Sequence, residues 1–252
     1  MNTESNILTL SNGMQFMHVP AGPFLMGKKD DNRPPFGDFK LLHTVDISYD
    51  FWMGRYPVTN ELYNAYLKSL GIEDPDDGWE EEKKNHPVVW VPWGKAIAYC
   101  QWLNNLHKEE LPSGLILRLP TEAEWEKTAR GTDGREYPWG NVFDAKNCNT
   151  RDSASSGFDG KTTRVGLYSP QGDSPYGCAD MAGNVWEWTH SLQKPYPYDV
   201  NDGREDETAD GTRILRGGSY NNGGNFAFCA NRIEQLDLRF SGFRVVISVG
   251  LP

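Results

Sequence analysis

Apolar and polar residues alternate along the first part of the chain. Residues 14–27 alternate, turn at Pro20 to Pro23 and alternate again, a pattern typical of two strands joined as a hairpin. Residues 28–42 are polar and rich in Pro, so we expect a loop there. Alternation resumes from His43 to Trp52, which predicts a half-buried strand. Its inner face carries Val45, Ile47, Tyr49 and Phe51.

Three later stretches have helical periodicity. Thr59 can cap the first helix, which Gly71 ends. A second helix is predicted from about Trp93, and Thr121 with Glu124 forms the capping box of a short third helix. The predicted inner faces consist of Leu62, Tyr63, Tyr66, Leu67 and Leu70, of Ala96, Ile97, Cys100, Leu103 and Leu106, and of Trp125.

Outside these elements the regular pattern thins out. Residues 73–85 are strongly acidic with a short basic end, which predicts a solvated excursion. Gly, Asn, Asp and Ser dominate residues 131–163 and 195–211, which predicts long irregular loops. Late strands are predicted at 214–216 and 242–247. Because no internal repeat or low-complexity linker interrupts the chain, we expect residues 1–252 to form one compact α+β domain.

Composition narrows the class of partner. A formal net charge of −10 argues against a nucleic-acid partner, since phosphate binding requires clustered Lys and Arg. No apolar run approaches the ~20 residues that a membrane span needs. The start of the chain lacks the basic and apolar regions of a secretory signal, so we expect a soluble, cytoplasmic protein, with surface display as the alternative.

The sequence offers few metal ligands of the soft or imidazole type. The four cysteines form no CxxC motif, which argues against a thiolate zinc site and favours buried free thiols over disulfides. The five histidines have no metal-ligand spacing, and we expect each to be a surface or core residue. These are Cys100, Cys148, Cys178 and Cys229, and His18, His43, His86, His107 and His190.

Carboxylates are more numerous, and they occur in three settings. In residues 180–188, Asp180 and Glu187 flank a turn at Gly183 and Asn184, where positive φ angles can direct carbonyl oxygens toward a cation such as calcium. The alternative is a structural turn whose Trp residues belong to the core. We expect Glu122, Glu124 and Glu126 to cap or solvate the third helix, and Asp202, Glu205, Asp206, Glu207 and Asp210 to stay hydrated.

Six ordered motifs carry a family resemblance that covers about residues 14–248. They are His86 to Trp93, Leu119 to Glu126, Tyr137 to Asn141, residues 180–188, Arg216 to Tyr220, and Gly242 to Arg244. The chain resembles the sulfatase-modifying-factor domain, the superfamily of the formylglycine-generating enzyme. This resemblance implies a C-type-lectin-like fold with short antiparallel sheets, two main helices, long irregular loops and structural calcium.

The same resemblance implies positions for two calcium sites. One would use Asp180, Gly183, Val185 and Glu187, with side chains at the ends and carbonyl groups between them. The other would use Asn149, Thr150 and Phe158, although Ser156 replaces the aspartate of the family there, so that this site requires Asp159 as a substitute.

Catalysis is where the sequence departs from the family. The formylglycine-generating enzyme holds copper(I) with two thiolates that follow its Gly-Gly-Ser motif, and soft sulfur ligands suit that ion. Here the corresponding positions are Asn222 and either Ala227 or a neighbouring residue, while Cys229 matches a downstream structural cysteine better. We therefore expect no copper and assign no catalytic residue. The iron-dependent sulfoxide synthases of the superfamily use histidines from an additional N-terminal helical domain, and we do not expect this sequence to contain one.

A third branch of the superfamily, which includes the variable proteins of diversity-generating retroelements, binds ligands without catalysis. Its binding segment lies between Gly-Gly-Ser and Gly-Phe-Arg, which here corresponds to residues 219–240. Aromatic and amide side chains suit such a surface, because aromatics give contact area at low entropic cost and amides adapt their hydrogen bonds. The predicted ligand-binding residues are Trp186, Ser219, Tyr220, Asn221, Asn222, Asn225, Phe226, Phe228, Asn231, Arg232 and Glu234.

The sequence thus favours a non-catalytic ligand-binding module whose partner is a protein or a small molecule. Ile233, Gln235, Asp237, Arg239 and Phe240 could extend its surface. Three alternatives stay open: a metal-dependent oxidoreductase that uses the same pocket, an accessory domain of a larger assembly, and an ordinary loop that packs on Trp186 and binds nothing.

Overall fold

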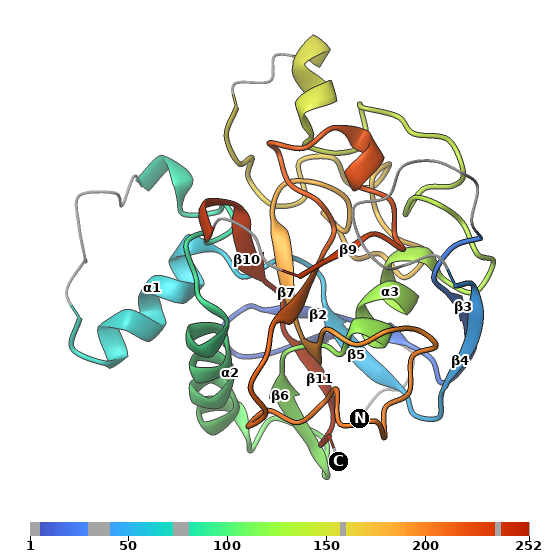
Figure 1. Cartoon of the computed structure of the whole chain (residues 1–252). Helices are drawn as coiled ribbons and strands as arrows, with labels where there is room; N and C mark the ends of the chain where they lie inside the picture. Colours follow the sequence, from blue (N-terminus) through green and yellow to red (C-terminus); the bar gives the residue numbers. More distant parts are fainter. Residues whose placement is uncertain (1–5, 30–40, 73–80, 157–159, 235–237, 252) are drawn as a thin grey trace.

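The computed structural model describes residues 6–29, 41–72, 81–156, 160–234 and 238–251 (Figure 1). A five-stranded antiparallel sheet brings the two ends of the described chain together. Its strands are, in spatial order, β1 (Ile7–Thr9), β2 (Gln15–Val19), β5 (Phe51–Gly54), β11 (Val246–Val249) and β6 (Leu115–Arg118). The last strand of the chain therefore lies in the middle of the sheet, between β5 and β6.

Two smaller sheets complete the strand architecture. A four-stranded sheet runs in the order β10 (Ser241–Phe243), β7 (Trp186–Leu192), β8 (Arg213–Arg216) and β9 (Arg232–Ile233). Strand β10 pairs with β7 in parallel, whereas the other pairs are antiparallel. The third sheet pairs β3 (Gly22–Met26) with β4 (His43–Ile47).

The predicted hairpin over residues 14–27 is wrong, although both of its strands exist. Strand β2 pairs with β1 and β5, and β3 pairs with β4, so the turn between them passes the chain from one sheet to another. The carboxylate of Asp50 accepts a hydrogen bond from Ala21 N (2.7 Å) and holds that corner. Two predicted single strands are likewise divided between sheets: residues 43–52 give β4 and β5, and residues 242–247 contribute to β10 and β11.

The three predicted helices are confirmed as α1 (Asn60–Ser69), α2 (Trp93–His107) and α3 (Glu122–Arg130). Thr59 caps α1 and the capping box of Thr121 and Glu124 opens α3, as the sequence indicates. Among the described helices, none combines the length and apolar character that crossing a bilayer requires. Short 3-10 turns occur at Glu81–Lys83, Arg151–Ser156, Gly224–Phe226 and Leu238–Phe240.

The helices lie on opposite flanks of the sheets, with α1 and α2 on one side and α3 near β3 and β4 on the other (Figure 1). Aromatic rings fill the space near α2, where Tyr99 lies 5.2 Å from Phe243 between ring centroids. Leu106 and Leu70, which we expected to face inward, are 56% and 53% exposed. In the last turn of α2, His107 takes the buried position, so Leu106 points outward.

The third helix corrects our expectation about its carboxylates, because Glu122, Glu124 and Glu126 are completely buried. Glu124 caps the helix and pairs with Arg118 (2.8 Å), while Glu122 and Glu126 both contact Arg216 at 2.7 and 2.8 Å. These ion pairs outweigh the burial that alone would raise the pKa values of Glu122 and Glu124, and both pKa values are lowered. Helix α3 thus carries several buried ion pairs that connect it to the rest of the molecule.

The acidic run at 202–210 is only partly hydrated. Glu205 is buried, and its carboxylate lies 3.0 Å from His190 Nδ1 and accepts a hydrogen bond from Tyr198 Oη at 2.9 Å. Asp206, Glu207 and Asp210 are exposed, as expected. The expected irregular loops at 131–150 and 195–211 are confirmed, whereas strands β6 and β7 were not predicted.

Candidate functional site

Two glycines direct the chain into the predicted binding segment. Gly217 and Gly218 have φ angles of +99° and +77°, which side chains other than glycine rarely tolerate. A Cβ on Gly218 would lie 3.0 Å from the carbonyl oxygen of Phe226. A Cβ on Gly217 would lie 3.1 Å from the ring of Trp125. The glycines therefore allow residues 219–226 to fold back tightly beside the core.

Asn222 lies at the centre of this segment. Its Oδ1 accepts hydrogen bonds from Trp186 Nε1 (2.9 Å) and from Ser219 Oγ (2.6 Å). Trp186 and Ser219 are buried, so the amide oxygen satisfies two polar groups that water does not reach. Ala227, which the sequence resemblance matches to the second thiolate of the family, is 1% exposed, and its side chain offers no ligand atom. Both positions thus serve packing and hydrogen bonding.

The thiols of the chain are inert. All four cysteines are free and buried, as the sequence predicted. Burial raises the pKa of Cys229 to about 12 and does the same for Cys148 and Cys178. It also raises the pKa of Cys100. At neutral pH these groups are therefore neutral thiols, which neither bind metal nor attack substrates well.

The structure divides the predicted ligand-binding residues into exposed and buried groups. Asn221, Asn225 and Glu234 are exposed, and Tyr220, Asn222, Phe226 and Phe228 are partly exposed. Tyr220 packs edge to face on Phe240, with 5.4 Å between ring centroids. The buried members are Trp186, Ser219, Asn231 and Arg232. Only the first two groups, which we call the exposed face, can touch a partner directly.

The buried members have structural partners. Asn231 Nδ2 donates to Phe226 O at 2.7 Å, which closes the segment on itself. Arg232 donates from Nη2 to Glu122 at 2.9 Å. These two buried residues therefore hold in place the backbone that carries the exposed face.

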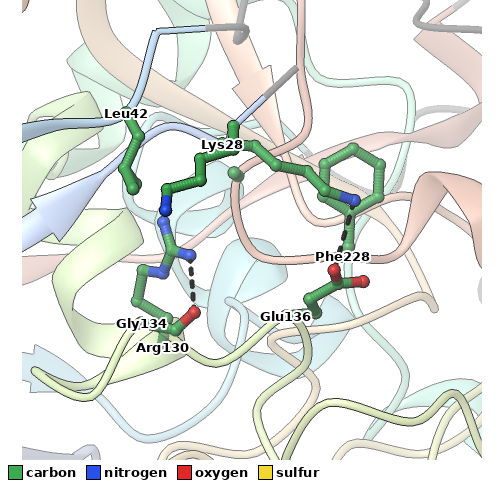
Figure 2. Close-up of a pocket in the computed structure, with 8 residues that line it drawn as sticks. Lys28, Leu42, Arg130, Gly134, Glu136 and Phe228 are labelled. Atoms are coloured by element: carbon green, nitrogen blue, oxygen red, sulfur yellow. Dashed lines mark hydrogen bonds and ion pairs between the residues drawn. The ribbon is translucent and has the colours of Figure 1, made fainter. Parts of the chain in front are cut away.

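Phe228 lines a small cavity of about 260 Å³ with Lys28, Arg130 and Glu136 (Figure 2). Lys28 Nζ lies 5.0 Å from the centroid of the Phe228 ring and 3.4 Å from Glu136 Oε1. In Figure 2, Lys28 extends toward Phe228 and Glu136, while Arg130 donates from Nη2 to Gly134 O at 3.0 Å. Phe228 thus already has a cation of this chain as its neighbour.

The geometry of residues 180–187 fits calcium poorly. Glu187 Oε2 accepts from Arg244 Nε and from Trp125 Nε1, both at 2.6 Å, and Glu187 Oε1 accepts from Arg244 Nη2 at 2.6 Å. The guanidinium therefore neutralises the charge that a calcium ion would need. Asp180 Oδ2 accepts from Gly166 N at 2.7 Å, and burial raises the pKa of this carboxyl to about 6. Val185 is a buried core residue beside them.

Residues from the two expected calcium sites lie side by side. Gly183 and Asn149 form a β-bridge, and a Cβ on Gly183 would lie 2.3 Å from Asn149 O. Asn184 N donates to Asn149 O (2.8 Å), and Thr150 is buried next to this contact. Phe158 lies outside the described residues. Within the described ranges, no three His, Cys, Asp or Glu side chains converge as metal ligands would.

Sequence reasoning missed the arginines that organise this region. Arg216, Arg232 and Arg244 are each at most 1% exposed, and each pairs with a buried glutamate. A signal existed, since Arg216 and Arg244 belong to two of the quoted motifs. Arginine is rarely buried without a paired acid. The sequence could therefore indicate that these arginines pair with carboxylates, but only the fold identifies which carboxylates.

Comparison with known proteins agrees with this architecture. Residues 6–249 match the model of the sulfatase-modifying factor enzyme 1-like domain. The chain is 29% identical over 265 residues to the formylglycine-generating enzyme of Thermomonospora curvata, covering 80% of this chain and 81% of that protein. It is 37% identical over 257 residues to the inactive C-alpha-formylglycine-generating enzyme 2 of Mus musculus, covering 81% and 73%.

Solved structures resemble the whole described fold. PvdO from Pseudomonas aeruginosa superposes with a TM-score of 0.75 at 26% identity, covering 96% of this chain and 98% of that one. Treponema denticola variable protein 1 superposes with a TM-score of 0.68 at 22% identity, covering 96% and 98%. The second similarity is one of fold. The expected α+β fold with short sheets and long loops is thereby confirmed.

Proposed function

Since the chain belongs to the sulfatase-modifying factor enzyme 1-like family, we propose that it is a non-catalytic, ligand-binding member of it. Its binding surface is the exposed face of residues 219–240, in the manner of the variable proteins of diversity-generating retroelements. The observation that carries this proposal is the chemistry at Asn222 and Ala227. At the two positions that the sequence resemblance assigns to the copper thiolates of the enzyme, the chain carries an amide that accepts from Trp186 Nε1 and a buried methyl group.

The exposed face has the composition of a recognition surface. Asn221 and Asn225 present amides to solvent, and the edge-to-face pair of Tyr220 and Phe240 lies on the same segment. Aromatic rings with few rotatable bonds lose little entropy on binding, and amides can serve as donor or acceptor. The similarity in fold to the Treponema denticola variable protein and in sequence to an inactive mouse relative supports this proposal.

An oxidoreductase that uses the same pocket is the second candidate. The 29% identity to the formylglycine-generating enzyme of Thermomonospora curvata favours it. Metal analysis of protein purified without chelator separates the two: stoichiometric copper or iron would favour chemistry at this site, and its absence favours binding.

A peptide-library selection tests the binding function. A phage-displayed random peptide library is selected on the immobilised protein, and enriched peptides are measured against Tyr220→Ala, Asn221→Ala and Asn225→Ala. We expect each variant to weaken binding by about fivefold or more, since aromatic and amide contacts at an interface centre contribute on the order of 1 kcal/mol each. Leu106→Ala, on an exposed part of α2, is the matched control and should leave binding unchanged.

The melting temperature decides how the results are interpreted. The exposed Asn variants should melt as the wild type does, because their side chains face solvent. Enriched peptides that bind all three face variants as tightly as the wild type would refute the proposed surface. Failure to enrich any peptide in repeated selections would refute the binding function for this class of ligand.

A further inference from the structure

A larger cavity, of about 550 Å³, lies at one end of the four-stranded sheet. Three neighbouring strands contribute to it: Trp188 comes from β7, Arg213 from β8, and Glu234 follows directly after β9. Trp93, the first residue of α2, and residues 207–212 form its other walls. The cavity therefore adjoins the segment 219–240, and Asn222 is not part of its lining.

Two indole rings form a rigid wall of this cavity. Trp93 Nε1 donates to Thr189 O at 2.9 Å, and Trp188 Nε1 donates to Val91 O at 2.8 Å, so both rings are held in place. The guanidinium carbon of Arg213 lies 4.1 Å from the centroid of a Trp93 ring. Tryptophan attracts cations more strongly than the other aromatic side chains. Arg213 therefore covers part of the Trp93 ring, while Trp93 stays partly exposed and can meet a further group.

The charge of the lining favours a cation as well. Glu207, Asp210 and Glu234 line the cavity and are exposed, while Arg213 is the one cation in the lining. Arg213 donates to the main-chain oxygens of His190 (2.8 Å), Asp206 (2.8 Å), Glu207 (3.1 Å) and Ala209 (3.1 Å) rather than to carboxylates. In the described structure, Asp210 and Glu234 have no hydrogen-bond or ion-pair partner. With three carboxylates and one guanidinium the lining has a net negative charge, and such a concave site concentrates cations.

We propose that this cavity binds a lysine or arginine side chain of a polypeptide partner. The inference names the partner class for the proposed binding function and rests on it. A side chain on a polypeptide fits better than a free amine, because Glu234 and Leu238 of the cavity lining belong to the segment 219–240, so that one partner can touch the exposed face and the cavity together. The cation would contact the indole wall and the carboxylates of Asp210 and Glu234 together, which gives both affinity and selectivity for positive charge.

The experiment uses one peptide in two forms. The probe is a short peptide with one arginine and one lysine between Gly-Ser spacers, and its neutral match carries citrulline and acetyl-lysine at the same places. Binding to the full chain is measured by titration calorimetry, and the emission of the tryptophans is followed in parallel. The variant that tests the cavity, called the cavity variant, carries Asp210→Asn and Glu234→Gln together. The matched control is Glu61→Gln with Glu109→Gln, which removes the same charge from exposed carboxylates elsewhere.

We expect the charged peptide to bind, to change tryptophan emission, and to bind the cavity variant roughly fivefold to thirtyfold more weakly. The control variant should bind it as the wild type does, and the neutral peptide should not bind. Equal loss in both variants would reduce the effect to overall charge and overturn the inference. Tighter binding of free spermidine than of the peptide would overturn the polypeptide as partner.

The experiments distinguish a failure of the cavity inference from a failure of the proposed binding function. If peptides selected from the library bind through Tyr220 and Asn225 but ignore the cavity variant, the inference is wrong and the binding function stands. The substituted carboxylates face solvent and hold no buried group, so the variants should fold normally. Their melting temperatures provide the check.

Discussion

Arg244 and Glu187 face each other as a bidentate ion pair, with both guanidinium-to-carboxylate distances at 2.6 Å and both residues completely buried. Arg244 lies between β10 and β11, and it also donates to Gly54 O and Ala179 O, each at 3.0 Å. One guanidinium therefore joins strands of two sheets to the turn that precedes β7. Two parallel N–H···O bonds between opposite charges give this contact both strength and a fixed direction.

Removing Arg244 should be severely destabilising. Arg244→Ala leaves the carboxylate of Glu187 buried with only Trp125 Nε1 as donor, and breaking a buried pair in this way costs about 3–5 kcal/mol. Urea unfolding followed by circular dichroism measures the loss. Arg164→Ala, at an exposed arginine, should change the free energy of unfolding by less than about 0.5 kcal/mol. Equal stability of the two variants would show that the pair adds nothing.

Calcium should leave the stability of the chain nearly unchanged. Because Arg244 already neutralises Glu187, this carboxylate attracts a calcium ion less strongly than an unpaired one would. Melting curves recorded with 1 mM EDTA and with roughly millimolar calcium, the affinity range of weak calcium sites, should therefore coincide. A rise of several degrees in calcium would restore the calcium site that the family resemblance implies.

Asp180 should make the protein less stable as the pH rises from about 4 to about 6. Burial raises its folded-state pKa to about 6, above its unfolded value, so the folded state holds a proton that the unfolded state has released. The contribution is present below pH 4 and lost through pH 6, by about 2–3 kcal/mol.

Asp180→Asn isolates this effect. Asparagine can still accept the Gly166 N–H, and it tolerates the φ angle of +56° at this position. We expect the variant to be about 2–3 kcal/mol more stable than the wild type at pH 8 and equal to it at pH 4. Urea unfolding at the two pH values is the measurement, and a pH-independent difference between the proteins would contradict the assignment.

Asn222 should matter more for stability than its neighbour Asn221. Asn222→Ala leaves the buried Nε1–H of Trp186 without an acceptor, which costs about 1–3 kcal/mol. Asn221 is exposed, so Asn221→Ala should change stability by less than about 0.5 kcal/mol. The comparison is made by denaturant unfolding. Indistinguishable midpoints would mean that water or another group satisfies the indole.

The four thiols should react slowly in the native state. A thiol reagent that needs the thiolate, applied at pH 8, should label the native protein poorly, because burial both shields these groups and raises their pKa values. After unfolding in guanidinium chloride all four should react within minutes. Rapid labelling of one thiol in the native protein would identify an exposed cysteine and contradict the buried arrangement.

Local signals predicted the helices well. Thr59 and the capping box at Thr121 satisfy free N–H groups within a single turn, so the sequence alone contains the information. Strand pairing was harder, because alternation shows that residues 14–27 form strands but not which edge each strand joins. The hairpin prediction failed for this reason.

In the candidate functional site, too, some features follow from residue identity and others only from the fold. The missing thiolates at Asn222 and Ala227 and the exposure of Asn221 and Asn225 could be inferred from residue identity. The pairing of Glu187 with Arg244 spans 57 positions, and no local pattern encodes it. The calcium expectation rests on carboxylates and carbonyl groups along the sequence and on the family resemblance, whereas the burial of those carboxylates and their distant partner follow only from the fold.

Arg216, Arg232 and Arg244 fix the backbone before, within and after the stretch that carries the exposed face. Substitutions at Asn221 or Asn225 therefore leave intact the anchors on which folding depends. Such an arrangement tolerates substitutions at solvent-exposed positions, whereas substitutions at the buried arginines a few residues away destabilise the fold. A protein engineer could randomise those outward positions, keep the three guanidinium anchors constant, and obtain a library whose members all retain the same scaffold.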